Sequence, residues 1–453
     1  MYSNYNRQAT YTLILLAFLS FNLGISQIPE LLKKEVQYRV QNHINPSIAV
    51  GLTDSTGTHF YVHGWRDLEK QIKADQHTLY EIGSITKSFT GLLLAKFILE
   101  DSLNLETGVN KFLPDSIDLT DKKGNQVTLK SLATHSSGLP RLPSNLTVTN
   151  QYNPYASYDQ DKMYGFLSHH TPQTVGQNFV YSNLGFGLLG VALSNYKNTA
   201  FRILIHDHIL KPLELKHTYF DVPKAEQSHL AKGYIGTQSV PLWDFKVMDA
   251  AGALKTTITD LQQFGKQFLD ASSPLAKASK IATKNYFTDK DKNTYGLGWF
   301  IDEQGTVFHG GGTGGFRTFI AIDFTKNRVI SVMTNSGSSS IEDLAKYLLN
   351  PKAYPLQIDK QEVAISKEQL RPYQGEYIND GLGLHYTITL KDHHLYAKLN
   401  LQPEFPLYYQ GDESFIYKVV KAKVVFEKDE NNTVVGLLLH QNGQEIQFVK
   451  TNP

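Results

Sequence analysis

Residues 81 to 91 read Glu81-Ile82-Gly83-Ser84-Ile85-Thr86-Lys87-Ser88-Phe89-Thr90-Gly91, and they place a hydroxyl and an amine three positions apart. At the start of a helix, one turn brings both side chains onto the same face. A serine hydroxyl is a poor nucleophile until a base takes its proton, and a lysine amine can do so where desolvation lowers its pKa. The pair Ser84 and Lys87 therefore suits acyl transfer, although a helix-capping serine beside a solvated lysine has the same spacing.

The residues after Lys87 predict a buried helix. Phe89, Leu92, Leu93 and Phe97 recur at i, i+3, i+4 and i+8, which is the apolar stripe of a helix packed into a core. We therefore expect Ser84 at or near the buried N-terminus of that helix.

Length and charge narrow the class of protein. The chain has 453 residues, of which 41% are hydrophobic, and this favours a globular protein with more than one domain. Lys plus Arg is 44 and Asp plus Glu is 43, so no basic excess indicates a nucleic-acid partner. We expect a small-molecule or peptide substrate that is recognised locally, and a homo-oligomer is compatible with this composition.

The N-terminus resembles a secretory signal. A mostly apolar run over residues 11–23 follows Arg7, and Gly24-Ile25-Ser26 supplies small residues for cleavage. Residues 1–26 are predicted to be a cleaved signal peptide of a secreted or periplasmic protein, without a membrane span after cleavage. A span needs about 20 apolar residues, and an uncleaved anchor is the alternative. The chain has no cysteine, so neither a disulfide nor a thiol-linked lipid is available.

The region from residue 27 to 355 predicts an α+β fold, with an antiparallel sheet flanked by helices and an all-helical subdomain. Turn residues Asp54-Ser55-Thr56-Gly57 separate two strand-like runs, and residues 101–211 have helical, loop-rich character. A helix is expected at residues 340–349. The predicted strands are residues 48–52, 58–62, 305–309, 316–323 and 328–334.

A second domain is predicted at residues 375–453, after a linker over residues 356–374. Short alternating strands divided by turns are typical of a small sandwich or barrel. These strands are residues 386–390, 395–399, 424–426, 434–439 and 446–449.

Two further motifs carry chemically useful groups. Tyr181-Ser182-Asn183 precedes a glycine-rich apolar segment that is predicted to be a buried helix. A phenol can shuttle a proton where cations keep its pKa low, and an asparagine can orient an amine or a carbonyl. A packing tyrosine with a helix-capping asparagine is the structural alternative.

The other motif is His309-Gly310-Gly311-Gly312-Thr313-Gly314-Gly315, between two predicted strands. Glycines let a backbone approach a ligand and expose N–H groups, as an oxyanion site requires. A flexible hairpin loop is the alternative, but it does not explain the histidine.

These three motifs, in this order, resemble the serine β-lactamase and penicillin-binding protein superfamily. The resemblance covers about residues 40 to 350 and is closest to the branch of class C β-lactamases, D-alanyl-D-alanine carboxypeptidases, D-aminopeptidases and esterases. The C-terminal strands are similar to the lipocalin-like domain of some members, which would shape substrate access or oligomer contacts. Three further stretches look like hallmarks of the family: residues 132–140, 212–218 and 250–254.

The resemblance implies roles for individual residues. Ser84 would be the acylated nucleophile, Lys87 its proton acceptor, and Tyr181 the relay to the leaving group and to the deacylating water. Asn183 would hold Lys87 or the substrate amide. The N–H groups of Ser84 and Gly312 would form the oxyanion hole, and His309 and Gly311 would line the site.

The third motif departs from the Lys-Thr-Gly of typical β-lactamases, because His309 and Gly310 replace the lysine and the hydroxyl residue. A histidine is charged only part of the time near neutral pH, so we expect weaker binding of a substrate carboxylate. The predicted function is a serine hydrolase acting on D-amino-acid peptides, small esters or β-lactams. A catalytically silent penicillin-binding or sensor protein is the alternative. Neither a cofactor nor a metal is expected, because the paired histidines of the chain lack ligand spacing.

Overall fold

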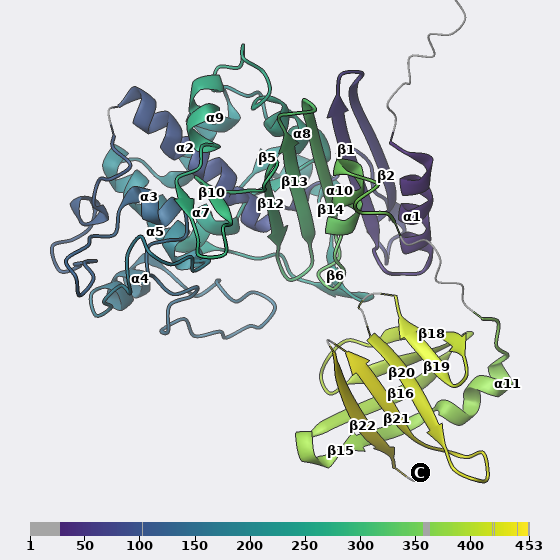
Figure 1. The fold of residues 1–453 in the computed structure, drawn as a ribbon. Helices are drawn as coiled ribbons and strands as arrows, with labels where there is room; N and C mark the ends of the chain where they lie inside the picture. Colours follow the sequence, from purple (N-terminus) through teal and green to yellow (C-terminus); the bar gives the residue numbers. More distant parts are fainter. Residues whose placement is uncertain are drawn as a thin grey trace, which may run out of the picture.

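The computed structural model describes residues 28–101, 103–356, 363–418, 420, 422–441 and 443–451. These form a larger α/β unit followed by a small β-barrel (Figure 1). The predicted signal peptide, residues 1–26, lies outside the described residues. Within the described ranges, no helix combines the length and the apolar character that a bilayer crossing requires.

The larger unit is built on a nine-stranded antiparallel sheet in the order β3-β2-β1-β14-β13-β12-β11-β10-β9. The N-terminal hairpin joins the sheet beside the last strand of the unit, with Val50 opposite Val332. The predicted antiparallel sheet is therefore confirmed. Its strands are β1 (Ser47–Asp54), β2 (Gly57–Asp67), β3 (Ile72–Lys73), β9 (Phe287–Thr288), β10 (Thr294–Gly296), β11 (Trp299–Ile301), β12 (Val307–Gly312), β13 (Arg317–Asp323) and β14 (Arg328–Thr334).

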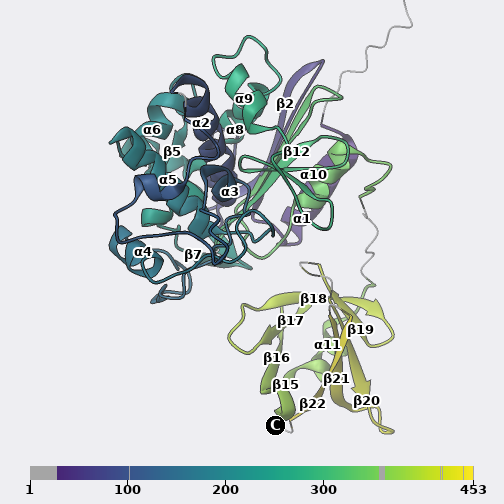
Figure 2. The same ribbon diagram turned by 60° about the vertical axis from the view of Figure 1, so that its left-hand side comes forward.

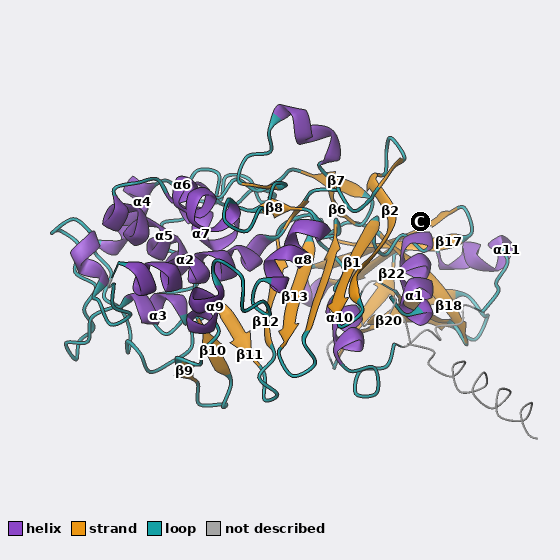
Figure 3. Cartoon of the chain, turned by 90° about the horizontal axis from the view of Figure 1, so that it is seen from above, coloured by secondary structure: helices purple, strands orange, loops and turns teal. Residues whose placement is uncertain are grey.

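Helices cover both faces of this sheet (Figure 3). Strand residues such as Val50 and Val332 pack with α1 (Glu30–Gln41) and α10 (Glu342–Leu349). Their neighbours, such as Ala49 and Met333, belong to the core shared with α2 (Thr86–Glu100) and α8 (Ile258–Lys266). Successive side chains of a strand point to opposite faces. Strands buried on both faces therefore read as nearly continuous apolar runs.

The helix after Ser84 forms as the periodicity predicts. A 3₁₀ turn at Gly83–Ile85 leads into α2 (Thr86–Glu100), and the side chains of Phe89, Leu92, Leu93 and Phe97 are fully buried. Phe89 stacks on Phe264 of α8 with ring centroids 3.7 Å apart. The start of α2 is thereby held against the sheet.

A helical region lies beside the sheet and contributes the second wall of the site (Figure 1). The predicted buried helix after Tyr181 is α5, and Ser182 caps it by accepting the N–H of Gly185 at 2.8 Å. The other elements of this region are α3 (Leu129–Ala133), α4 (Gln160–Leu167), α5 (Asn183–Lys197), α6 (Phe201–Ile205), α7 (Asp249–Gly252), α9 (Ala276–Ala282), the sheet of β4 (Tyr80–Glu81), β8 (Lys255–Thr256) and β5 (Thr218–Tyr219), and the hairpin of β6 (Gly233–Ile235) and β7 (Gln238–Val240).

The C-terminal unit is a closed eight-stranded barrel with sequential strand order, preceded by α11 (Lys367–Leu370). Large aromatic side chains, including Tyr377, Phe415, Phe426 and Phe448, fill its interior. The predicted barrel is confirmed. Its strands are β15 (Gly375–Asn379), β16 (Leu384–Lys391), β17 (His394–Leu399), β18 (Phe405–Gly411), β19 (Ser414–Tyr417), β20 (Ala422–Lys428), β21 (Val434–Gln441) and β22 (Gln444–Lys450).

The barrel contacts the larger unit at the end of α1 (Figure 2). The Tyr408 hydroxyl donates to the carbonyl oxygen of Asn42 at 2.9 Å, and Lys418 Nζ donates to Asn42 Oδ1 at 2.9 Å. Asn42 is the residue that caps the C-terminus of α1. It therefore ends a helix of the larger unit and also accepts hydrogen bonds from two side chains of the barrel.

Alanine substitutions at two helical glycines distinguish the effect of packing on stability from the effect of helix propensity. A Cβ at Gly91 in α2 would lie 1.8 Å from the Leu297 carbonyl oxygen, whereas a Cβ at Gly165 in α4 would meet nothing within 4 Å. We expect Gly91→Ala to lower the free energy of unfolding by about 2 kcal/mol through overpacking, and Gly165→Ala to raise it by about 0.5 kcal/mol. Urea unfolding measures both, and equal effects would contradict the close approach of α2 to residue 297.

Candidate active site

The 3₁₀ turn that carries Ser84 is pressed against β12. A Cβ at Gly83 would lie 2.7 Å from the Gly312 nitrogen, and Gly83 has a φ of +48°. Both the space and the backbone conformation therefore require glycine before the serine. Ser84 itself remains partly exposed, so its hydroxyl is accessible.

Lys87 is fully buried beneath Ser84. Its Nζ lies 3.2 Å from Ser84 Oγ and donates to Asn183 Oδ1 at 2.9 Å and to the Ala251 carbonyl oxygen at 2.6 Å. Lys87 belongs to α2, Asn183 begins α5, and Ala251 lies in α7. Three helices that are distant in sequence thus meet at one amine.

Burial, assisted by the Arg141 cation, holds the pKa of Lys87 well below its usual range. A neutral amine has two N–H groups and one lone pair. Because Asn183 and Ala251 accept the two N–H groups, the lone pair is left for the Ser84 hydroxyl. The arrangement can accept a proton from Ser84.

Tyr181 covers this pair. Lys87 Nζ lies 4.9 Å from the centre of the Tyr181 ring, and the ring of His135 stacks on the phenol at 4.3 Å. Burial raises the pKa of Tyr181, and this outweighs the opposing effects of the Ser84 hydroxyl and the Arg141 cation. The role inferred from the sequence needs nearby cations to keep the pKa of Tyr181 low. The structure instead favours a protonated phenol.

Both the oxygen and the nitrogen of the Asn183 side-chain amide are hydrogen-bonded. Its Oδ1 accepts from Lys87, and its Nδ2 donates to the Tyr155 hydroxyl at 2.9 Å. Tyr155 stacks on Phe245 with ring centroids 5.1 Å apart. Tyr155 was not a predicted site residue, because it lies in a loop-rich region without a motif.

His309, Gly311 and Gly312 lie along β12, on the edge that faces the serine. Strand β11 pairs with β12 only at Val307 and Phe308, which leaves the following residues open on that side. A Cβ at Gly311 would lie 1.9 Å from the Ile82 carbonyl oxygen. Without side chains, the two glycines let the β12 backbone approach the turn that carries Ser84.

His309 is buried and close to Tyr181, with ring centroids 6.3 Å apart. Burial and the nearby Lys87 lower the pKa of His309 to about 3, although a hydrogen bond with the Gly310 carbonyl opposes them. The histidine is therefore uncharged at neutral pH. The sequence predicts that His309 binds a substrate carboxylate weakly. The structure goes further, because an uncharged His309 offers no positive charge to a carboxylate.

The sequence also gave no signal for Glu81. Its buried carboxylate accepts from Thr313 Oγ1 at 2.7 Å and from the Trp243 backbone N–H at 2.8 Å. Burial raises the pKa of Glu81. Glu81 thus ties the glycine loop after β12 to the strand that leads into Ser84.

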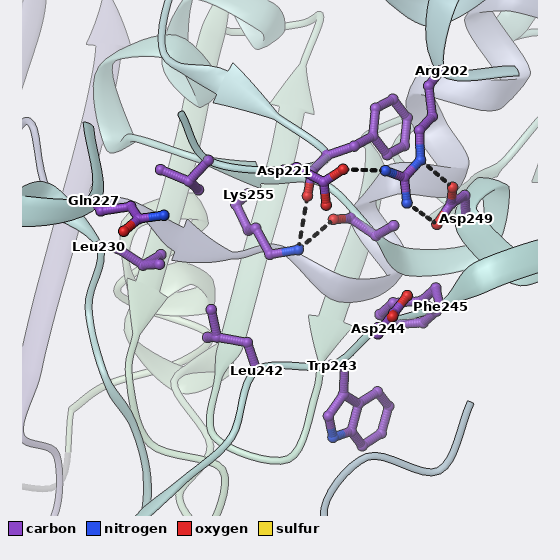
Figure 4. A pocket seen from close by; sticks show the side chains of 13 residues that line it. Arg202, Asp221, Gln227, Leu230, Leu242, Trp243, Asp244, Phe245, Asp249 and Lys255 are labelled. Atoms are coloured by element: carbon purple, nitrogen blue, oxygen red, sulfur yellow. Dashed lines mark hydrogen bonds and ion pairs between the residues drawn. The ribbon is translucent and has the colours of Figure 1, made fainter. Parts of the chain in front are cut away.

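A separate hollow of about 330 Å³ lies near β8 (Figure 4). The Lys255 ammonium donates there to the carbonyl oxygens of Phe220 and Ala253, and Arg202 pairs with Asp221 and Asp249. None of the predicted site residues lines this hollow. Within the described ranges, no three His, Cys, Asp or Glu side chains gather in a way that could hold a metal ion.

Two family models match the chain, one over the larger α/β unit and one over the barrel. A Beta-lactamase family model matches residues 32–339, and a model named Domain of unknown function (DUF3471) matches residues 359–450. The chain belongs to the beta-lactamase family. The resemblance inferred from the three motifs is confirmed at this level.

Two curated relatives cover part of the chain. Protein flp of Staphylococcus aureus strain MW2 is 33% identical over 305 residues, which are 64% of this chain and 60% of that protein. A beta-lactamase of Providencia stuartii is 32% identical over 190 residues, which are 42% of this chain and 46% of that protein. The match spans 60% or less of the length of each relative.

Solved structures share the fold. The octameric penicillin-binding protein homologue from Pyrococcus abyssi has a TM-score of 0.63 and 21% identity, and the match covers 93% of this chain and 99% of that one. A class C beta lactamase from Rhodobacter sphaeroides has a TM-score of 0.61 and 22% identity, over 71% of this chain and 100% of that one. At these identities the likeness concerns the fold alone.

The buried neutral His309 makes stability depend on pH. Its pKa is about 3 in the folded protein and 6.5 when unfolded, so only the unfolded state gains a proton as pH falls from 6.5 towards 3. Protonation of the unfolded state lowers the free energy of unfolding by about 2 kcal/mol between pH 7.5 and pH 5. We expect His309→Asn to lose that much less stability than the wild type between pH 7.5 and pH 5 in urea unfolding.

The exposed His393 in the barrel supplies a control. His393→Asn should keep the wild-type difference between the two pH values. An equally steep loss of stability in His309→Asn would contradict an uncharged His309.

Proposed function

We propose that this chain is a serine hydrolase that forms an acyl-enzyme at Ser84 on amide or ester substrates. One observation carries the proposal: the buried Lys87 Nζ lies 3.2 Å from Ser84 Oγ, while Asn183 Oδ1 and the Ala251 carbonyl oxygen accept its other hydrogen bonds. A binding pocket alone has no need for an activated nucleophile.

Acylation follows from the positions of these groups. The Ser84 proton passes to Lys87 Nζ as Oγ forms a bond to the substrate carbonyl carbon, and the N–H groups of Ser84 and Gly312 receive the oxyanion. In other enzymes the loss of one such donor costs about 3 to 4 kcal/mol of barrier. The bond to the leaving group then breaks as the Tyr181 hydroxyl protonates the departing atom, and Lys87 returns its proton to Tyr181.

Deacylation uses the same groups with water as the nucleophile. Lys87 accepts the water proton, and Ser84 leaves as the hydroxyl after receiving that proton. The substrates proposed are D-amino-acid peptides, small esters and β-lactams. The uncharged His309 disfavours those that need a cation on β12 to hold a carboxylate.

The second candidate is a penicillin-binding or sensor protein that is acylated but does not turn over. The raised pKa of Tyr181 favours it, because a protonated phenol leaves the activation of the deacylating water to Lys87 alone. The two candidates differ in the lifetime of the acyl-enzyme, which separates them by experiment.

We further propose that residues 1–26 direct export, which makes the protein secreted or periplasmic. The catalytic unit would span residues 27–355, the linker residues 356–374 and the barrel domain residues 375–453. An oligomer is also proposed, because the Pyrococcus abyssi homologue of similar fold is octameric.

The nucleophile and its base are tested together. A fluorophosphonate probe should add one adduct to the intact mass of the wild type, located on Ser84, and none to Ser84→Ala. Lys87→Met should lower kcat/KM for a nitrophenyl ester by about 100-fold or more, the range of general-base catalysis.

Lys96→Met is the matched control on the same helix, because Lys96 pairs with Glu100 at the surface. It should retain wild-type activity. Labelling that persists in Ser84→Ala, or an active Lys87→Met, would refute the assignment. An adduct with a penicillin that never decays would instead support the silent candidate.

The pKa directions predict the shape of the pH profile. Protonated Lys87 cannot accept the Ser84 proton, so kcat/KM should fall in acid and reach its plateau well below pH 10.5, the usual pKa of a lysine. Because burial raises the pKa of Tyr181 above its usual 10, no falling limb is expected below that pH. Hydrolysis of an uncharged ester from pH 5 to 10 measures the profile, and a falling limb near pH 8 that disappears in Tyr181→Phe would contradict it.

A further inference from the structure

Arg141 is an exposed cation beside the catalytic groups. Its guanidinium carbon lies 4.9 Å from the centre of the Tyr181 ring. The Arg141 carbonyl oxygen accepts the N–H groups of Asn183 at 3.0 Å and Leu184 at 3.3 Å. The backbone of Arg141 is therefore fixed to the start of α5, and its side chain reaches from the helical wall to the phenol.

The guanidinium of Arg141 is not neutralised. In the described part of the chain it makes neither a hydrogen bond nor an ion pair, and its one recorded contact is the aromatic ring. Other arginines are paired with carboxylates, such as Arg202 with Asp249 and Arg328 with Asp323. A guanidinium offers five N–H donors in a planar fork that matches a carboxylate. Those donors are free at Arg141.

The charge of Arg141 distinguishes it from the buried groups around Ser84. Lys87 is buried and held towards its neutral form, and His309 is uncharged at neutral pH. Beside Gly312 on β12, the Arg317 guanidinium donates to the carbonyl oxygens of Thr313 at 2.7 Å and Phe316 at 2.8 Å. That cation is tied to the backbone of the glycine loop, whereas the Arg141 guanidinium is exposed and can receive an anionic group of a substrate.

We propose that Arg141 is a specificity-determining residue whose guanidinium binds a carboxylate on the leaving group of the substrate. The proposal rests on the proposed acyl-transfer function, in which Tyr181 protonates the leaving group. A cation stacked on that phenol lies beside the departing amine or alcohol. The preferred substrates are amides or esters whose leaving group carries a free carboxylate, as the last residue of a peptide does.

A matched pair of esters tests this assignment. The hippuryl ester of 3-hydroxybenzoate has a leaving group with a carboxylate, and the hippuryl ester of 3-hydroxybenzamide has a neutral group of the same size. Release of the phenol is followed by absorbance, and the ratio of the two kcat/KM values isolates the effect of the charge. The wild type should prefer the carboxylate ester, mainly through a lower KM.

In Arg141→Gln the ratio should fall by about fivefold, the size of a well-formed exposed ion pair. Arg141→Lys keeps the charge but loses the fork, so its ratio should be intermediate. Salt at 0.5 M should reduce the wild-type ratio by screening. Arg371→Gln is the control, because Arg371 is an exposed arginine of the second unit, and it should keep the wild-type ratio.

The outcomes separate this inference from the function on which it rests. If Ser84 is acylated and both esters are hydrolysed, but Arg141→Gln keeps the wild-type ratio, the role of Arg141 is overturned and the hydrolase remains. If neither ester nor the fluorophosphonate probe acylates Ser84, the proposed hydrolase fails, and the role of Arg141 fails with it. An equal loss of ratio in Arg371→Gln would also overturn the assignment, because the effect would then be general electrostatics.

Discussion

The buried amine of Lys87 is the constraint on which the site depends. A charged ammonium in this position would cost several kcal/mol to desolvate, whereas a neutral amine with both N–H groups bonded costs far less. Asn183 and Ala251 supply those two acceptors from α5 and α7. The packing of α2 against the sheet, through Phe89 on Phe264, holds the amine where both acceptors reach it. The fold therefore sets the position of the group beside Ser84 and, through burial, lowers its pKa.

The same burial pushes the neighbouring groups towards their neutral forms. The pKa values of His135 and His309 are lowered and that of Tyr181 is raised, each mainly by desolvation. In the acyl transfer that we propose, these neutral groups would leave the developing oxyanion as the main new charge, where backbone N–H donors are most effective. Arg141 differs from these buried groups, because it is an exposed cation whose guanidinium carbon lies 4.9 Å from the centre of the Tyr181 ring.

The parts of the fold that follow from local pattern were predictable. The stripe at Phe89 and Phe97 gave α2, and the apolar runs gave the central strands, because burial on both faces leaves no polar alternation. In the barrel, β15, β18 and β19 were not among the predicted strands. β18 contains Pro406 and ends at Gly411, its pairing with β19 shifts register between Tyr409 and Gly411, and β19 has four residues. The contacts of Arg141, Tyr155 and Glu81 were out of reach, because each depends on partners brought together only by the folded chain.

Aromatic side chains fill the interior of the barrel, so its link to the larger unit lies in its surface contacts. Its loop residues Leu401 and Pro403 line a hollow of about 390 Å³ together with Ile235 and Gln238 of the β6–β7 hairpin. In that hairpin the Tyr234 N–H donates to the Asn335 carbonyl at 3.1 Å and lies 3.4 Å from that of Gly315. Gly315 belongs to the loop that follows β12, so one hairpin touches both the barrel and the glycine loop. Through this hairpin the barrel adjoins the β12 side of the site, where His309 and Gly312 lie.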